Sequence, residues 1–219
     1  TYNVAVSGMT GDGTVIASLG AGVATDTAGN PSAASTSTDN TVTRDTTGPT
    51  VTINQAGAQA DPTSGSPINF TVVFSESVAN FATGDVTLGG TAGATTQVVT
   101  GAGTTYNVAV SGMTADGTVI ASLAAGVATD ALGNPSAAST STDNTVTRDT
   151  TGPAVTINQA GAQADPTNGS PINFTVVFNE SVANFATGDV TLGGTAGATT
   201  QLVTGAGTTY NVAVSGMTG

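Results

Sequence analysis

Apolar and polar residues alternate along several short stretches of the chain, and each stretch is bounded by glycine, proline or aspartate. The clearest stretch is 68–75, in which one side consists of Ile68, Phe70, Val72 and Phe74. A period of two residues predicts a β-strand with one buried face. The same criterion predicts strands at 51–54, 85–88, 95–100, 118–123 and 140–147, and a further strand through Tyr106, Val108 and Val110.

Seven short strands separated by turn residues are typical of an all-β, immunoglobulin-like β-sandwich. Tyr106 is expected to belong to its core. Immunoglobulin domains of antibodies also carry two cysteines and a tryptophan in their core, and this chain has neither residue type. The prediction of the fold therefore depends on the number of strands and on their alternating pattern.

The sequence repeats itself almost unchanged with a period of 104 residues, the offset between residues 1 and 105. Residues 1–10 return at 105–114 and at 209–218, and residues 44–49 return at 148–153. Tandem repeats of one sequence adopt one fold and contact their neighbours in the array. If each unit begins at the Asp45 motif, residues 1–44 are the C-terminal part of a preceding Ig-like repeat. Residues 45–148 are then a complete repeat, and residues 149–219 are the N-terminal part of a following one.

This arrangement leaves two kinds of assembly open. The repeats can be stacked along one long chain, or the partial repeats of neighbouring chains can complete each other by donating strands. In both cases the expected partners are neighbouring identical repeats, in the same chain or in the same fibre.

The charge of the chain is almost entirely negative, with 14 acidic residues, two arginines and no lysine, for a net charge of −12. Such a chain cannot neutralise phosphates, which argues against nucleic acid and against an anionic membrane surface as partners. No apolar run is long enough to insert into a membrane as a helix. A divalent cation is the partner that this charge favours.

Catalytic chemistry finds little support in the composition. The chain has no histidine, no cysteine and no lysine. It therefore lacks the usual general base at neutral pH, a thiolate nucleophile and a Schiff-base amine. We predict that the protein is not an enzyme.

Loops at one end of a sandwich of this topology bring distant acidic residues together. In the complete repeat the acidic residues expected there are Asp45, Glu76, Asp85 and Asp130. Their counterparts in the partial repeats are Asp26, Asp149, Glu180 and Asp189. Calcium binds clusters of carboxylate and carbonyl oxygens in irregular geometry, so these residues are the predicted calcium ligands.

Several of these residues also have a purely structural interpretation. Asp130 opens the segment Asp-Ala-Leu-Gly-Asn-Pro, in which it can cap backbone amides of a turn instead of binding metal. Asp116 followed by Gly117 is typical of a hairpin turn. Arg44 and Arg148 are expected to pair locally with a linker carboxylate.

Four motifs carry a resemblance to a known family: Asp45-Thr-Thr-Gly-Pro49, Phe70-Thr-Val-Val-Phe-Ser-Glu-Ser-Val78, Asp85-Val86 and Asp130-x-x-Gly-Asn-Pro135. Together they resemble the bacterial immunoglobulin-like repeats of giant surface adhesins and biofilm-associated proteins. The resemblance implies display outside the cell, on the bacterial cell surface, and often calcium that rigidifies the junctions between domains.

The function that follows is that of a structural extender, a stalk or a fibre, with ligand binding located elsewhere in the full protein. The alternative is a binding module for a glycan or another surface ligand, through the threonine-rich face of residues 140–147.

Overall fold

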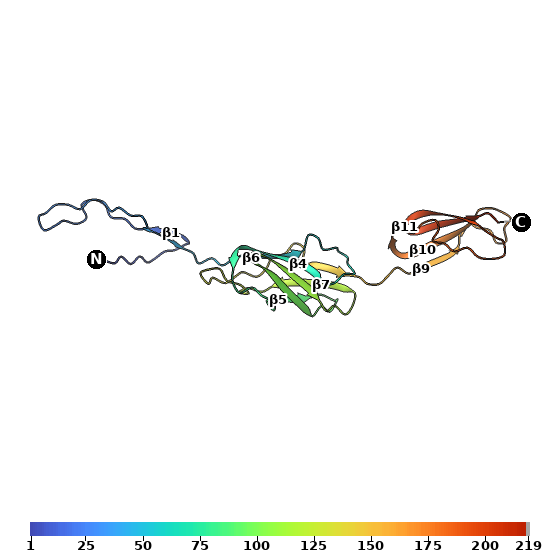
Figure 1. The fold of residues 1–219 in the computed structure, drawn as a ribbon, viewed down its shortest axis with the longest axis horizontal. Coiled ribbons are helices and arrows are strands. Elements are labelled where there is room, and N and C mark those ends of the chain that lie inside the picture. Colours follow the sequence, from blue (N-terminus) through green and yellow to red (C-terminus); the bar gives the residue numbers. More distant parts are fainter. Residues whose placement is uncertain (218–219) are drawn as a thin grey trace. The chain divides into compact units, whose positions relative to one another are not determined.

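The computed structural model describes residues 1–217, and all of its regular structure is β-strand (Figure 1). The chain divides into two compact units, Thr1–Thr150 and Thr151–Gly219. Among the described residues there is no helix that is long and apolar enough to cross a membrane.

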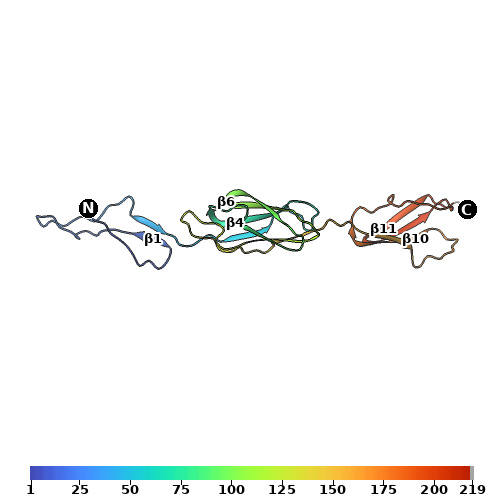
Figure 2. The same ribbon diagram turned by 90° about the horizontal axis from the view of Figure 1, so that it is seen from below.

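The complete repeat in the first unit consists of two antiparallel sheets of three strands each. One sheet has the order β3 (Val51–Gln55), β4 (Ile68–Val78) and β6 (Thr96–Ser111). The other has the order β5 (Val86–Gly89), β7 (Gly117–Leu123) and β8 (Thr145–Arg148). Figure 2 shows β4 and β6 side by side within this part of the chain. The prediction of an all-β sandwich is confirmed.

The core of this repeat is formed by the alternating residues of both sheets. Ile53, Phe70 and Val108 from the first sheet are fully buried in one cluster with Val119 and Val146 from the second. The alternation of apolar and polar residues in the sequence therefore matches the alternation of buried and exposed side chains, because successive side chains of a strand point to opposite faces.

Three aromatic rings close one part of the core. Phe74, Phe81 and Tyr106 meet edge to face, with ring centroids 5.0 to 5.9 Å apart. The Tyr106 hydroxyl donates a hydrogen bond to the carbonyl oxygen of Val78 at 3.5 Å. The expectation that Tyr106 belongs to the core is confirmed.

The two strands predicted at 95–100 and around Tyr106 are parts of a single element, β6, that doubles back on itself. The N–H of Thr95, the residue before β6, donates to the carbonyl oxygen of Ser111, the last residue of β6, at 3.2 Å. Gly103 adopts a φ of 71°, and a Cβ on Gly101 would lie 2.5 Å from the Thr105 carbonyl oxygen. Both positions require glycine for this close return of the backbone.

The strand predicted over 140–147 is also different from the prediction, because this segment changes partners. Thr140 lies parallel to Thr52 on β3, whereas Thr145 begins the antiparallel pairing of β8 with Ile120 on β7. Between these pairings, the N–H groups of Thr142 and Asp143 both donate to Asn54 Oδ1 at 3.0 Å. The flat threonine-rich face expected from the sequence is therefore not formed as one strand.

The two partial repeats each contain one part of the sandwich. β1 (Gly13–Ile16) and β2 (Thr41–Arg44) pair in the register of β7 and β8. In the second unit, β9 (Val155–Gln159), β10 (Ile172–Val182) and β11 (Thr200–Ser215) reproduce the sheet of β3, β4 and β6.

Identical residues differ in burial and even in secondary structure between these copies. Val108 is fully buried, whereas its counterpart Val4 is 72% exposed. The sequence Val-Thr-Leu-Gly forms β5 at 86–89, where it pairs with β7, but forms no strand at 190–193. The opposing strands therefore decide burial and pairing, and the local sequence alone does not.

Because Val108 is buried and Val4 is exposed, replacing each by alanine should change the free energy of unfolding by different amounts. Val108→Ala should lower the free energy of unfolding by about 2 kcal/mol, from two buried methyl groups at about 0.8 kcal/mol each and a residual cavity. Val4→Ala is the matched control and should have almost no effect, because Val4 is exposed. Urea unfolding followed by circular dichroism measures both, and equal destabilisation would contradict the burial described above.

Candidate functional site

Three carboxylates come together at one end of the complete repeat. Asp45 precedes β3, Glu76 lies near the end of β4, and Asp130 lies in the loop between β7 and β8. One carboxylate oxygen from each lies within 4.8 Å of the others. Calcium holds oxygen ligands at about 2.3–2.6 Å, so two ligands on opposite sides of one ion are about 4.6–5.2 Å apart. The spacing and the donor chemistry both fit calcium.

Asp130 is the most buried member of this group and is held by its own turn. Its Oδ1 accepts the N–H groups of Leu132 and Asn134, both at 2.8 Å, and its Oδ2 accepts the Asn134 side-chain amide at 2.7 Å. Burial acts to raise the pKa of Asp130, but the hydrogen bonds from Asn134, Leu132 and Gly133 outweigh it and hold that pKa below its usual value. Asp130 is therefore ionised at neutral pH.

The turn around Asp130 forms independently of the other two carboxylates. Asp26, its counterpart in the first partial repeat, accepts the N–H groups of Ala28 and Asn30 and the Asn30 side-chain amide, each at 2.9 Å. The same bonds lower the pKa of Asp26, that from the Asn30 side chain most of all. Asp130 therefore caps the amides of its own turn, as the structural interpretation of this residue expects. It leaves room for a cation as well, because a carboxylate has about four acceptor positions.

The backbone around Asp45 is fixed against the turn of residues 130–135. The Asp45 carboxylate accepts the Thr47 N–H at 3.0 Å, and its carbonyl oxygen accepts the Asn134 side-chain amide at 3.5 Å. A Cβ on Gly48 would lie 1.9 Å from the Pro135 carbonyl oxygen, so only glycine permits this approach. The motif that opens the repeat is therefore shaped by its contact with this loop.

Among the described residues 1–217, the other predicted ligands do not join a group of three. Asp85 accepts the Ala82 N–H at 2.8 Å and caps its own turn, and Asp189 makes the same bond with Ala186. Asp26 has no counterparts of Asp45 and Glu76 before it in the sequence. Asp149 and Glu180 belong to different units, and no counterpart of Asp130 follows them within the 219 residues.

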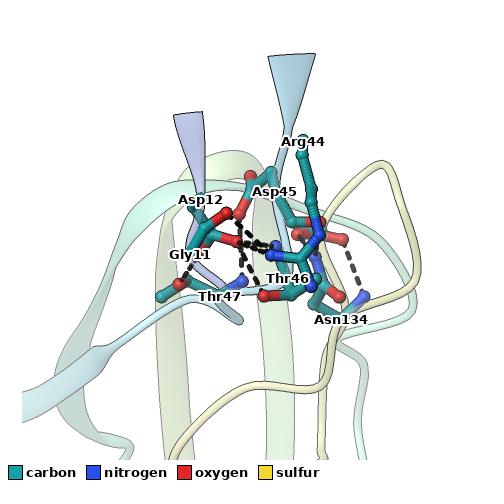
Figure 3. A network of polar contacts seen from close by, with 8 residues as sticks. Gly11, Asp12, Arg44, Asp45, Thr46, Thr47 and Asn134 are labelled. Carbon is teal, nitrogen blue, oxygen red and sulfur yellow. Dashed lines mark hydrogen bonds and ion pairs between the residues drawn. The ribbon is translucent and has the colours of Figure 1, made fainter. Parts of the chain in front are cut away.

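A second site, centred on Asp12, holds the segment that connects two repeats (Figure 3). Asp12 Oδ1 accepts the N–H of Thr46 at 2.9 Å and its hydroxyl at 2.7 Å, while Oδ2 accepts the Thr47 hydroxyl at 2.5 Å. Arg44 donates to the Gly11 carbonyl oxygen at 2.8 Å and lies 3.4 Å from Asp12. We call these contacts of Asp12 with Arg44, Thr46 and Thr47 the linker clamp.

The linker clamp recurs one repeat further on. Asp116 accepts the N–H of Thr150 at 2.9 Å and its hydroxyl at 2.6 Å, and Arg148 lies 3.5 Å from Asp116. The arginines thus pair with the aspartate that precedes β1 or β7, and not with a linker carboxylate as expected. The sequence signal for the clamp was the joint recurrence of Asp-Gly with Arg-Asp-Thr-Thr in both copies.

The linker clamp also changes the acidity of Asp12. The Thr47 hydroxyl foremost, and then that of Thr46, donate to the ionised carboxylate and hold the pKa of Asp12 below its ordinary value of 3.8. Burial opposes this shift, and the charge of Arg44 adds the smallest contribution. The clamp is therefore fully formed at neutral pH.

Comparison with known proteins agrees with the fold. Residues 45–147 match the family model described as a bacterial Ig-like domain. The match spans the complete repeat from the Asp45 motif to the end of β8, and the two-sheet sandwich described above is the fold of such domains. Among curated proteins, no match to the chain was found.

Removing the carboxylate of Asp12 should release the linker. In Asp12→Ala, the amide of Thr46 loses its acceptor, so its hydrogen exchange measured by NMR should become faster. Asp39→Ala is the matched control, since it removes an exposed carboxylate of the same partial repeat that accepts none of the bonds described here. Unchanged exchange at Thr46 in Asp12→Ala would show that the clamp does not order the linker.

The order of the linker should also depend on pH. Because the folded pKa of Asp12 lies below the unfolded one, the clamp contributes fully above the ordinary value of 3.8 and is lost as the pH falls through the lower folded pKa. Thr46 amide exchange, corrected for its intrinsic pH dependence, should therefore accelerate only below that ordinary value. Asp12→Asn should abolish the transition, and a transition that persists in Asp12→Asn would assign it to another group.

Proposed function

We propose that this protein is an extracellular structural repeat, an extender or a fibre-forming segment of a bacterial surface adhesin or biofilm filament, with calcium that rigidifies its junctions. The observation that carries the proposal is the way in which the connecting segment 44–47 is held. The match to a bacterial Ig-like domain supports a place at the bacterial surface, where such domains occur.

The connecting segment 44–47 contacts both the preceding partial repeat and the complete repeat. On one side, Asp12 of the preceding partial repeat binds Thr46 and Thr47. On the other side, Asp45 belongs to the group of three carboxylates of the complete repeat. A cation bound by that group would fix Asp45, which directly follows Arg44, the last residue of β2. Two restraints on consecutive residues leave the chain little freedom to bend there.

Electrostatics favours a cation at this place. Asp45, Glu76 and Asp130 bring three negative charges within 4.8 Å in a chain whose net charge is −12. Their mutual repulsion is relieved by a divalent ion, and calcium accepts irregular sets of carboxylate and carbonyl ligands. These three residues would supply the charged ligands, and calcium would cross-link the entry segment, β4 and the loop after β7.

A structural role also agrees with the sequence, which lacks histidine, cysteine and lysine, and with the repetition of one unit. The alternative of a glycan-binding face over 140–147 gains no support from the geometry. The hydroxyl groups of Ser141 and Thr142 in this segment donate to Asn54 Oδ1 at 3.1 and 3.4 Å.

Calorimetric titration tests the cation site. Calcium should bind the chain with a Kd of about 0.1–1 mM, the range of extracellular calcium modules. Glu76→Gln removes one charge without changing size and should weaken binding roughly tenfold or more. Asp143→Asn, an exposed acid that lies outside the three-carboxylate group, should leave the affinity unchanged. Equal affinity in all three proteins would remove Glu76 from the site, and absence of binding to the unmodified chain would refute the calcium proposal.

The extender function requires that calcium change the mechanics of an array. A polypeptide of three complete repeats should show a smaller maximum dimension by small-angle scattering and a lower melting temperature after chelation than with calcium. If chelation changes neither quantity, calcium does not stiffen the junctions.

A further inference from the structure

The first and last segments of the complete repeat, 49–55 and 137–143, are hydrogen-bonded directly to each other. They run parallel, with Thr52 beside Thr140. Backbone hydrogen bonds of 2.6 to 3.2 Å connect the two segments, and their donor and acceptor residues are Ala137 to Pro49, Thr140 to Val51, Ile53 to Thr140 and Gln55 to Asp143. The segment that opens the repeat is therefore tied to the segment that closes it.

The side chain of Asn54 on β3 adds to this connection. Its Oδ1 accepts the N–H groups of Thr142 and Asp143, both at 3.0 Å. The Ser141 hydroxyl donates to the same oxygen at 3.1 Å. Replacing Asn54 by a residue without an acceptor would therefore remove the partner of the Thr142 amide.

A second parallel pairing holds the end of β8. Thr63, in the loop after β3, lies beside Arg148. The Thr63 N–H donates to the Thr147 carbonyl oxygen, and the Asp149 N–H donates to the Thr63 carbonyl oxygen, both at 2.9 Å. Asp61 Oδ1 also accepts the Thr147 N–H at 2.9 Å. We call the contacts of residues 49–63 with residues 137–149 the parallel joint.

The direction of the two segments determines how the parallel joint responds to tension along the chain. The segment 49–55 runs away from the end of the repeat at which the chain enters, and 137–148 runs parallel to it towards the end at which the chain leaves. A pull on both connecting segments therefore acts in opposite directions along these strands and slides one past the other. Bonds between sliding strands share the load and must break together, whereas bonds that are opened from one end break one at a time.

We propose that the parallel joint, with Asn54 as its main side-chain contact, is the element that keeps the repeat folded when the chain is stretched. The use of this resistance in an array rests on the proposed extender function, whereas the resistance itself belongs to the single repeat. Forced unfolding is governed by the unfolding rate and not by the equilibrium free energy. The parallel joint and the apolar core therefore contribute differently to mechanical and to thermal stability.

Single-molecule force spectroscopy of the full chain, in the presence of chelator, tests the direction of loading. The chain has no cysteine, so handles can be attached at introduced pairs. Thr43→Cys/Gly152→Cys places them on either side of the complete repeat and loads the parallel joint along its strands. Thr43→Cys/Ala138→Cys places both at the end where the chain enters and opens the parallel joint from that end. The first pair should require the higher unfolding force, and an equal or higher force for the second pair would overturn the proposal.

A substitution inside the parallel joint separates it from the core. With handles at 43 and 152, Asn54→Ala should lower the unfolding force, because the Thr142 amide loses its acceptor. Val108→Ala is the matched control, since it removes buried volume outside the parallel joint. It should lower the melting temperature at least as much as Asn54→Ala and the unfolding force less. An unchanged force in Asn54→Ala, or a force lowered as much or more by Val108→Ala, would contradict the proposal, and neither result bears on the calcium site.

Discussion

The interaction on which this structure depends is the burial of one sheet's apolar face against the other sheet. The sheet of β3, β4 and β6 presents a row of valine, isoleucine and phenylalanine side chains, and the sheet of β5, β7 and β8 presents valine, alanine and leucine. Neither sheet can remove its row from water alone. The chain contains its own comparison, because the same sequences occur with and without their opposing sheet. Where the opposing sheet is present the row is buried, and where it is absent the row is exposed.

The junction between repeats depends on a different kind of interaction. The segment 44–47 contains no apolar residue, and it is held by polar contacts of Thr46 with Asp12. An exposed hydrogen-bonded contact of this kind is modest in strength, and a cation that joins Asp45 to Glu76 and Asp130 would add to it. Sheet packing thus forms the repeat, while polar contacts of a carboxylate with threonines hold the segment between two repeats.

Much of the fold could be predicted from the sequence, because period-two alternation reports which face of a strand is buried and the 104-residue repeat gives the length of the unit. The partners of each strand could not be predicted in the same way. The return of β6 at Gly101 and Gly103 and the change of partner between Thr140 and Thr145 are decided by long-range pairing. For the site, loop topology brought Asp45, Glu76 and Asp130 together but could not show that Asp85 caps its own turn. The role of Asp12 was missed because an Asp-Gly pair also occurs in ordinary hairpin turns.

The most direct test of the dependence on the opposing sheet is to extend the chain after Gly219 with the sequence of residues 116–148 and to measure its thermal unfolding. The measurement is made at a concentration at which the unextended chain is monomeric. In the chain of 219 residues, the second unit should unfold at a lower temperature than the complete repeat, because its β9–β10–β11 sheet packs against no second sheet there. In the extended chain, both repeats should melt at the temperature of the complete one. A second unit whose melting temperature is unchanged by the extension would contradict this account.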